Sequence, residues 1–268
     1  MLFRFERVQV WPLPELVAPK PPLPRATYKF NAPTVTFVAS LVIQLALMIF
    51  SIVQLAAGQN GRPPLLFFAL WLETVVQIIE LAWYLILGVL FWARPSLVAS
   101  PGTFDVTLRY IDWFFSTPTM LATLYVLVYH FANECATFAD FEADVALAAH
   151  IAILLTSDWA MLAIGVLLER EMTPQTADCY FLMLGFIALV VAFVPHINVL
   201  VQHYSDEGVS LIVVNLALWC LYGLVVVVWP RRSRIASKHT AYNLLDLVSK
   251  NVLGLVVSVL VAVNQDPC

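Results

Sequence analysis

The chain has 268 residues, of which 61% are hydrophobic and only 12% are charged. Soluble domains carry about 25% charged residues, so this composition excludes an ordinary water-soluble domain and predicts a membrane protein. The formal net charge of −4 argues against nucleic acid as a partner. The four cysteines are too widely spaced for a CxxC motif, so the sequence predicts neither a metal site nor a disulfide framework.

Residues 1–32 form a basic, proline-rich segment, and proline at this density opposes a regular helix. We expect this segment to be an extended N-terminal tail and residues 33–268 to form one transmembrane domain. No apolar stretch of the kind found in a cleavable signal peptide occurs near the amino terminus.

Seven apolar segments follow, each long enough to cross a bilayer. Backbone polar groups in lipid need partners within their own segment, so each segment is expected to be a helix. The apolar runs are continuous rather than alternating, which excludes a β-barrel. The sequence therefore predicts an all-α, multi-pass integral membrane protein of a plasma or internal membrane. The segments are 34–58, 64–92, 104–131, 143–168, 177–202, 208–229 and 240–263.

A few ionisable residues interrupt these segments, and such residues inside a membrane are functional candidates by default. Arg109 and Asp112 are three residues apart, and Asp246 and Lys250 are four apart, so each pair shares a helical face. Two structural ion pairs are one interpretation. The other is a reactive lysine, because a desolvated lysine amine forms Schiff bases with aldehydes. Asp112 and Asp246 would then balance the positive charge.

Two motifs at these positions resemble those of a known family. The segment RYIDWFFSTP, residues 109–118, resembles the third helix of microbial (type 1) rhodopsins. The segment DLVSKN, residues 246–251, resembles their seventh helix, which carries the retinal-binding lysine. The resemblance covers about residues 34–264. It implies a seven-transmembrane-helix bundle with all-trans retinal in its core, covalently bound to Lys250 as a protonated Schiff base.

The resemblance also implies a set of charged and polar residues around that lysine. Asp112 would be the primary counterion and proton acceptor, and Asp246 would be the second counterion. Arg109 and Ser116 would complete the counterion network.

The walls of the retinal pocket are implied in the same way. Thr117 and Asp158 would form a hydrogen-bonded link between the third and fourth helices. Gly223 stands where the family usually has a proline, and Val226 stands where it has an aromatic residue. The residues expected to line the pocket are Trp113, Thr117, Met120, Met161, Gly165, Gly185, Trp219 and Tyr222.

The mode of action depends on other residues. Outward proton pumps of this family carry a carboxylate eleven residues after the counterion, where this chain has Thr123. Glu73, Gln77 and Glu80 share one face of the second segment. Acidic side chains that line a pore attract cations. With Asn251, these three residues are expected to line an ion pathway.

This second segment resembles that of channelrhodopsins, and residues 242–254 resemble rhodopsins of giant viruses. The favoured function is a light-gated cation channel. A slow light-driven proton pump and a sensory photoreceptor stay open as alternatives, and Glu73 and Glu80 would then form a protonated structural pair. No constellation of catalytic residues is recognisable, so an enzyme is not expected.

The expected partners are membrane lipid and small cations or protons, and a homo-oligomer is compatible with the sequence. Two arguments disagree about orientation. Most Lys and Arg residues outside the spans fall on the side of the amino terminus, which predicts that this side is cytoplasmic. The family resemblance implies that the amino terminus lies outside.

Overall fold

The computed structural model describes residues 32–58, 62–93, 103–133, 136–229 and 235–263. Apart from Ala32, the first residue of the first helix, the expected N-terminal tail lies outside these ranges. Within them are seven helices that are long and apolar enough to cross a membrane, as expected. They are α1 (Ala32–Ala56), α2 (Pro64–Ala93), α4 (Thr103–Ala132), α6 (Leu147–Glu169), α7 (Asp178–Gln202), α8 (Asp206–Val228) and α9 (Ile235–Val263).

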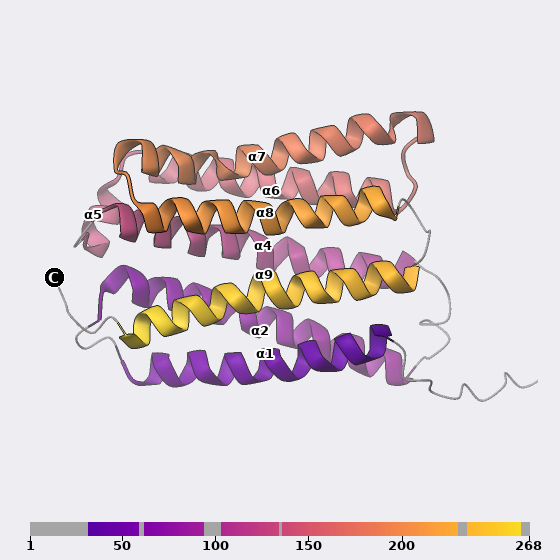
Figure 1. The fold of residues 1–268 in the computed structure, drawn as a ribbon, viewed down its shortest axis with the longest axis horizontal. Helices are drawn as coiled ribbons and strands as arrows, with labels where there is room; N and C mark the ends of the chain where they lie inside the picture. The colour runs from indigo at the N-terminus through magenta and orange to yellow at the C-terminus, as the bar shows by residue number, and fades with distance from the viewer. Residues whose placement is uncertain (1–31, 59–61, 94–102, 134–135, 230–234, 264–268) are drawn as a thin grey trace, which may run out of the picture.

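The seven helices run side by side and alternate in direction (Figure 1). The helix α9 packs on α1, α2 and α8, and α4 packs on α2, α6, α7 and α8. We call the end of the bundle where α1 begins the amino-terminal side, and the other end the opposite side. The helices α1, α4, α7 and α9 begin at the amino-terminal side, whereas α2, α6 and α8 end there (Figure 1).

The distribution of polarity is that of a membrane protein. Large apolar side chains face outward on the long helices, as Val42 of α1 and Val89 of α2 do, with 61% and 66% of their surfaces exposed. The ionisable side chains Glu73, Glu80 and Lys250 are at most 2% exposed. A soluble bundle would show the reverse arrangement. The outer surface therefore suits lipid, and the protein is a multi-pass integral membrane protein.

The segment expected at 143–168 corresponds to α6, which begins at Leu147. A short helix, α5 (Phe138–Ala143), precedes α6, and a second short element, η1 (Gln175–Ala177), precedes α7. The helix α5 begins with a capping box, in which Thr137 and Asp140 bond each other's backbone N–H groups. The hydrogen bonds from Thr137 hold the pKa of the Asp140 carboxyl below its ordinary value. Phe141 is buried against Tyr125 and Tyr129, so α5 covers part of the opposite side.

A proline inside α4 is accommodated by a neighbouring helix. Pro118 has no N–H group, so it cannot donate to the carbonyl of Phe114 one turn earlier. The indole N–H of Trp159 on α6 donates to that carbonyl instead, at 3.1 Å, and its ring stacks on Phe114. This contact secures α6 against α4 beside the residues Thr117 and Asp158.

Candidate functional site

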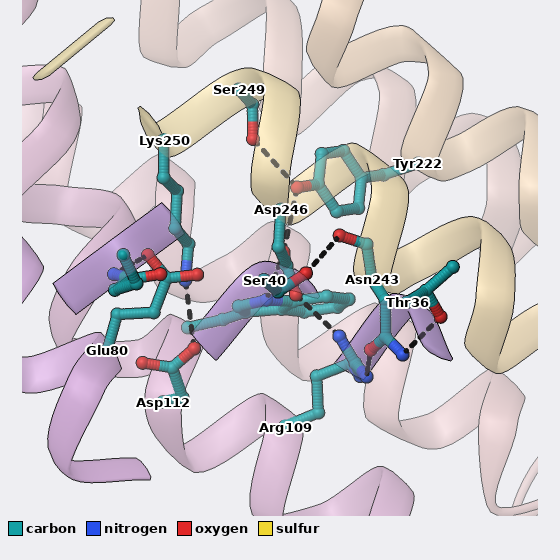
Figure 2. A network of polar contacts seen from close by, with 12 residues as sticks. Thr36, Ser40, Glu80, Arg109, Asp112, Tyr222, Asn243, Asp246, Ser249 and Lys250 are labelled. Carbon is teal, nitrogen blue, oxygen red and sulfur yellow. Dashed lines mark hydrogen bonds and ion pairs between the residues drawn. The ribbon is translucent and has the colours of Figure 1, made fainter. Parts of the chain in front are cut away.

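Two ion pairs join α4 to α9 in the middle of the bundle. The Lys250 Nζ atom donates to Asp112 Oδ2 at 2.8 Å, and the Arg109 guanidinium donates to Asp246 Oδ2 at 2.5 Å. Figure 2 shows that each pair crosses from one helix to the other. The expected sharing of a helical face is therefore correct, but each charge is balanced by the facing helix rather than by its neighbour in sequence.

The two aspartates have different surroundings. Asp246 Oδ1 accepts hydrogen bonds from the Trp113 indole at 3.1 Å and from the Tyr222 hydroxyl at 2.8 Å. Because Tyr222 donates its one proton there, the Ser249 hydroxyl must donate to Tyr222, at 2.8 Å. Asp112 Oδ1, in contrast, accepts no hydrogen bond from the described residues. Asp112 thus has an oxygen available to accept a proton, whereas Asp246 is held by three donors.

A third carboxylate lies at Lys250. Glu80 Oε1 is 3.7 Å from Lys250 Nζ, and Glu80 Oε2 accepts a hydrogen bond from Gln44 of α1 at 2.5 Å. In Figure 2, Glu80 and Asp112 flank the amine, and Asp246 is turned toward Arg109. The sequence placed Glu80 in an ion pathway and Asp246 as second counterion. The structure brings Glu80 next to the lysine and pairs Asp246 with Arg109.

The network extends to the amino-terminal side through residues that sequence reasoning missed. Arg109 also donates to Asn243 Oδ1 at 2.6 Å, and Asn243 donates to the Thr36 hydroxyl at 3.2 Å. Asn243 precedes Lys250 by seven residues, two helical turns on the same face, and that spacing was an available signal. Ser116, expected in the network, is buried, and its hydroxyl has no hydrogen-bond partner among the described residues.

Three polar side chains of the expected ion pathway lie together on α2 and α9. Both side-chain polar atoms of Glu73, Gln77 and Asn251 are buried, and none has a hydrogen-bond partner in the described part of the chain. Gly254 allows the two helices to approach here. A Cβ atom at that position would overlap Gln77 Nε2 and would lie 2.9 Å from Glu73 Oε1. Buried polar groups are normally satisfied, so six unsatisfied atoms indicate a place for water or ions.

An apolar cavity of about 110 Å³ lies on the other side of Lys250, among α4, α6, α7, α8 and α9. All eight expected lining residues border it, together with Lys250 and the two unusual positions Gly223 and Val226. Thr117 donates to Asp158 Oδ2 at 2.7 Å, so the expected link between α4 and α6 is present. Phe186 of α7 and Tyr242 of α9 also line the cavity and were not expected from the sequence.

The glycines in the wall keep the cavity in its present shape. A Cβ atom at Gly165 would lie 2.6 Å from the Tyr110 hydroxyl, and one at Gly223 would overlap the ring of Phe186. The ring of Phe186 thus occupies the space beside Gly223. An aromatic residue from α7 thereby contributes to the wall near Val226, where the family resemblance led us to expect an aromatic residue from α8.

Comparison with known proteins identifies the family. Residues 34–264 match the family described as bacteriorhodopsin-like protein. The chain belongs to the bacteriorhodopsin-like family. A search of curated proteins gave no match.

Solved structures share the fold of this bacteriorhodopsin-like protein at low sequence identity. The viral rhodopsin OLPVRII is 20% identical with a TM-score of 0.64, over 87% of this chain and 98% of that one. The blue light-absorbing proteorhodopsin from Med12 is 17% identical with a TM-score of 0.62, over 87% and 98% of the two chains. Xanthorhodopsin, described as a light-driven ion pump with a dual chromophore, is 15% identical with a TM-score of 0.62, over 86% and 93%.

The family implies a retinal chromophore, and the residues of this bacteriorhodopsin-like protein fit one. The cavity wall is almost entirely apolar, as a polyene requires, and the Lys250 amine borders it beside two carboxylates. Retinal therefore has both an apolar pocket and an amine within one site. The geometry supports a light-absorbing membrane protein of the ion-transporting or sensory kind.

Proposed function

We propose that this protein is a light-gated cation channel, in which retinal is bound to Lys250 Nζ as a protonated Schiff base. When bound, retinal absorbs the light and changes shape. Asp112, at 2.8 Å from Nζ, would be the primary counterion, and Glu80, at 3.7 Å, would share the charge with it. Asp246 would hold Arg109 and Tyr222 in place through the hydrogen bonds that it accepts from them.

The buried cluster of Glu73, Gln77 and Asn251 carries the proposal. Its six unsatisfied polar atoms lie between α2 and α9, directly beyond the lysine, where lipid cannot reach them. A carboxylate and two amides with free oxygen atoms can replace part of the hydration shell of a passing cation. A protein that needed these helices only for packing would gain more from aliphatic side chains at the same positions.

Polar groups continue from this cluster toward both sides of the membrane. Toward the amino-terminal side they include the network of Arg109, Asn243 and Thr36 described above. Toward the opposite side, the Ser51 hydroxyl of α1 bonds the Ser258 hydroxyl of α9 at 3.0 Å, and both are buried. A line of polar groups thus follows α1, α2 and α9 and passes the Lys250 site.

The pump is the second candidate, because the Asp112 carboxylate at 2.8 Å from Lys250 Nζ could accept a proton from that site. A pump also needs a group that returns a proton to the Lys250 site, and such a donor is less well supported. Thr123 occupies the expected donor position, and its hydroxyl donates to the carbonyl of Thr119 in its own helix. The side chains of Leu124 and Leu127, which follow on α4, are buried and apolar. The described residues of α4 that follow Thr117 include no carboxylate for efficient return of a proton.

The experiment is a photocurrent recording under voltage clamp with Glu73→Gln, and with Glu142→Gln as a matched control on the exposed surface of α5. If Glu73 faces the cation path, Glu73→Gln changes the size or reversal potential of the current and leaves the absorption maximum nearly unchanged. Glu142→Gln should match the parent in both measurements. A pump would instead give a current in one direction that persists without a driving force and is insensitive to replacement of sodium and potassium.

A further inference from the structure

Three ionisable side chains lie together between α4, α6 and α7, away from the line of polar groups that follows α1, α2 and α9. They are Tyr125 of α4, His150 of α6 and His196 of α7, and all three are buried. Both imidazole rings stand edge to face with the Tyr125 ring, with centroids at 5.6 and 5.8 Å. Ionisable groups inside a membrane are functional candidates by default. We call these three residues the histidine–tyrosine cluster.

The hydrogen bonds of the cluster show where it can accept a proton. His196 Nε2 lies 3.1 Å from the carbonyl oxygen of Leu121, which can only accept, so Nε2 carries a proton. His196 Nδ1 is buried and has no hydrogen-bond partner among the described residues. Buried charges are normally paired, and no ion pair of His196 occurs in the described part of the chain. The ring is therefore neutral, and Nδ1 keeps a free lone pair.

The third member of the cluster shares a proton with the tyrosine. His150 Nδ1 is 2.8 Å from the Tyr125 hydroxyl, and either group can be the donor of this bond. The carboxylate on the same face of α6, Asp158, is two turns away and accepts a hydrogen bond from Thr117. The cluster thus combines a free proton acceptor with a hydrogen bond whose direction can reverse.

A polar cavity of about 250 Å³ lies next to the cluster, toward the opposite side. Tyr129 in its wall follows Tyr125 by one helical turn, and Val199 in its wall follows His196 by three residues. Part of this wall is exposed, so the cavity opens to the surface. A polar cavity of this size has room for water, which can carry protons to the cluster. Its titratable lining residues are Tyr129, Asp140, Asp144 and His203.

A single ring connects the cluster to the retinal cavity. Phe193 packs on His196 with ring centroids 5.4 Å apart and on Trp219 with centroids 6.0 Å apart. Trp219 belongs to the wall of the retinal cavity, and all three rings are buried. Protein interiors are close-packed and transmit strain, so a displacement of Trp219 is passed to His196 through Phe193.

We propose that the histidine–tyrosine cluster is an internal proton-binding site that takes up a proton from the opposite side when retinal changes shape. The displacement of Trp219 and Phe193 loosens His196 from the Leu121 carbonyl and admits water to Nδ1. The proton comes from the aqueous phase through the polar cavity and adds to the Nδ1 lone pair, which converts the imidazole to an imidazolium. The inference rests on the proposed binding of retinal and is the same for a channel, a pump or a sensor.

The test is light-minus-dark infrared difference spectroscopy of the full-length protein with all-trans retinal in lipid nanodiscs, with and without isotope-labelled histidine. Formation of an imidazolium gives bands that move with the label. The parent should show these bands, and His196→Gln should lose them but keep its visible absorption. His130→Gln is the matched control and should keep the bands, because His130 is a half-buried histidine of α4 outside the cluster and the polar cavity.

Phe193→Leu removes the ring between Trp219 and His196, so it should reduce the imidazolium bands several-fold. Bands of equal size in the parent and in His196→Gln, or their loss in His130→Gln, would overturn the assignment to His196. An undiminished signal in Phe193→Leu would overturn the link to the retinal cavity. If His196→Gln does not fold, the parent and Phe193→Leu still decide.

The same spectra separate this inference from the proposed function. A parent that forms the visible band but no imidazolium signal refutes the proton-binding cluster alone. A parent without a visible band refutes retinal binding itself, and the light response of the cluster with it.

Discussion

Replacement of Lys238 by Met should destabilise the protein strongly, because Lys238 belongs to a second buried ion pair. Its Nζ atom lies 2.5 Å from Glu169 Oε1 and 2.6 Å from Glu169 Oε2, and the Tyr242 hydroxyl donates to Glu169 at 3.0 Å. Glu169 ends α6 and Lys238 lies in the first turn of α9, and both are less than 7% exposed. The pair therefore ties α6 to α9 on the amino-terminal side.

Removal of one member of a buried pair leaves a charge without its partner and costs about 3–5 kcal/mol, roughly a 150- to 5,000-fold change in the unfolding equilibrium. Lys238→Met removes the charge that balances the Glu169 carboxylate, which still accepts the hydrogen bond from the Tyr242 hydroxyl. The double variant Lys238→Met/Glu169→Leu removes both charges and should recover much of the loss. Unfolding in mixed detergent micelles, followed by loss of helical circular dichroism, measures these free energies. A single variant as stable as the parent, or a double variant less stable than the single one, would show that the ion pair does not stabilise the fold in this way.

Three further predictions concern other parts of the protein. Lys250→Ala should abolish the visible absorption band of protein mixed with all-trans retinal, and a retained band would remove Lys250 from the binding role. Asp112→Asn removes the carboxylate at 2.8 Å from Lys250 Nζ, so the absorption maximum should move to the red, or toward the ultraviolet if the linkage loses its proton. An unchanged spectrum would assign the counterion role to Glu80 or Asp246. Because the pKa of Asp140 is lowered in the folded state, its capping bonds stabilise α5 above the ordinary range for aspartate and are lost as the pH falls through the lowered value. The protection of the amides of residues 138–143 against hydrogen exchange, taken relative to the intrinsic rate at each pH, should therefore fall below about pH 4 in the parent, and Thr137→Ala should flatten that dependence.

The fold could be predicted because the bilayer imposes one simple rule on each segment. Continuous apolar runs of sufficient length are confirmed as the seven spans, with ends that differ by a few residues. The short helix α5 before the fourth span was not expected, because hydropathy does not detect the capping box at Thr137 that begins it. Lys238 precedes the segment expected at 240–263 and therefore counts as a loop charge in the orientation argument. The structure places it within the last span, paired with Glu169, so that argument loses one charge.

Many residues of the candidate site could be proposed from the sequence, but their interaction partners could not. Spacing along one helix indicates a shared face, and so it found Glu73, Gln77 and Glu80 and the charges around Lys250. It does not indicate which facing helix supplies the partner. The approach of Glu80 to Lys250 depends on Gln44 of α1, and the pairing of Asp246 depends on Arg109 of α4. The place of Phe186 beside Gly223 likewise arises from the packing of α7 on α8.

In the proposed channel, cations pass through the bundle along Glu73, Gln77 and Asn251 when the protein is illuminated. The reversal potential of the wild-type photocurrent tests this most directly, measured while external sodium and potassium are replaced by a large organic cation. A cation channel should give a current that changes sign with voltage and whose reversal potential moves when the permeant cation is replaced. A current of one sign at every voltage, unaffected by the replacement, would contradict it.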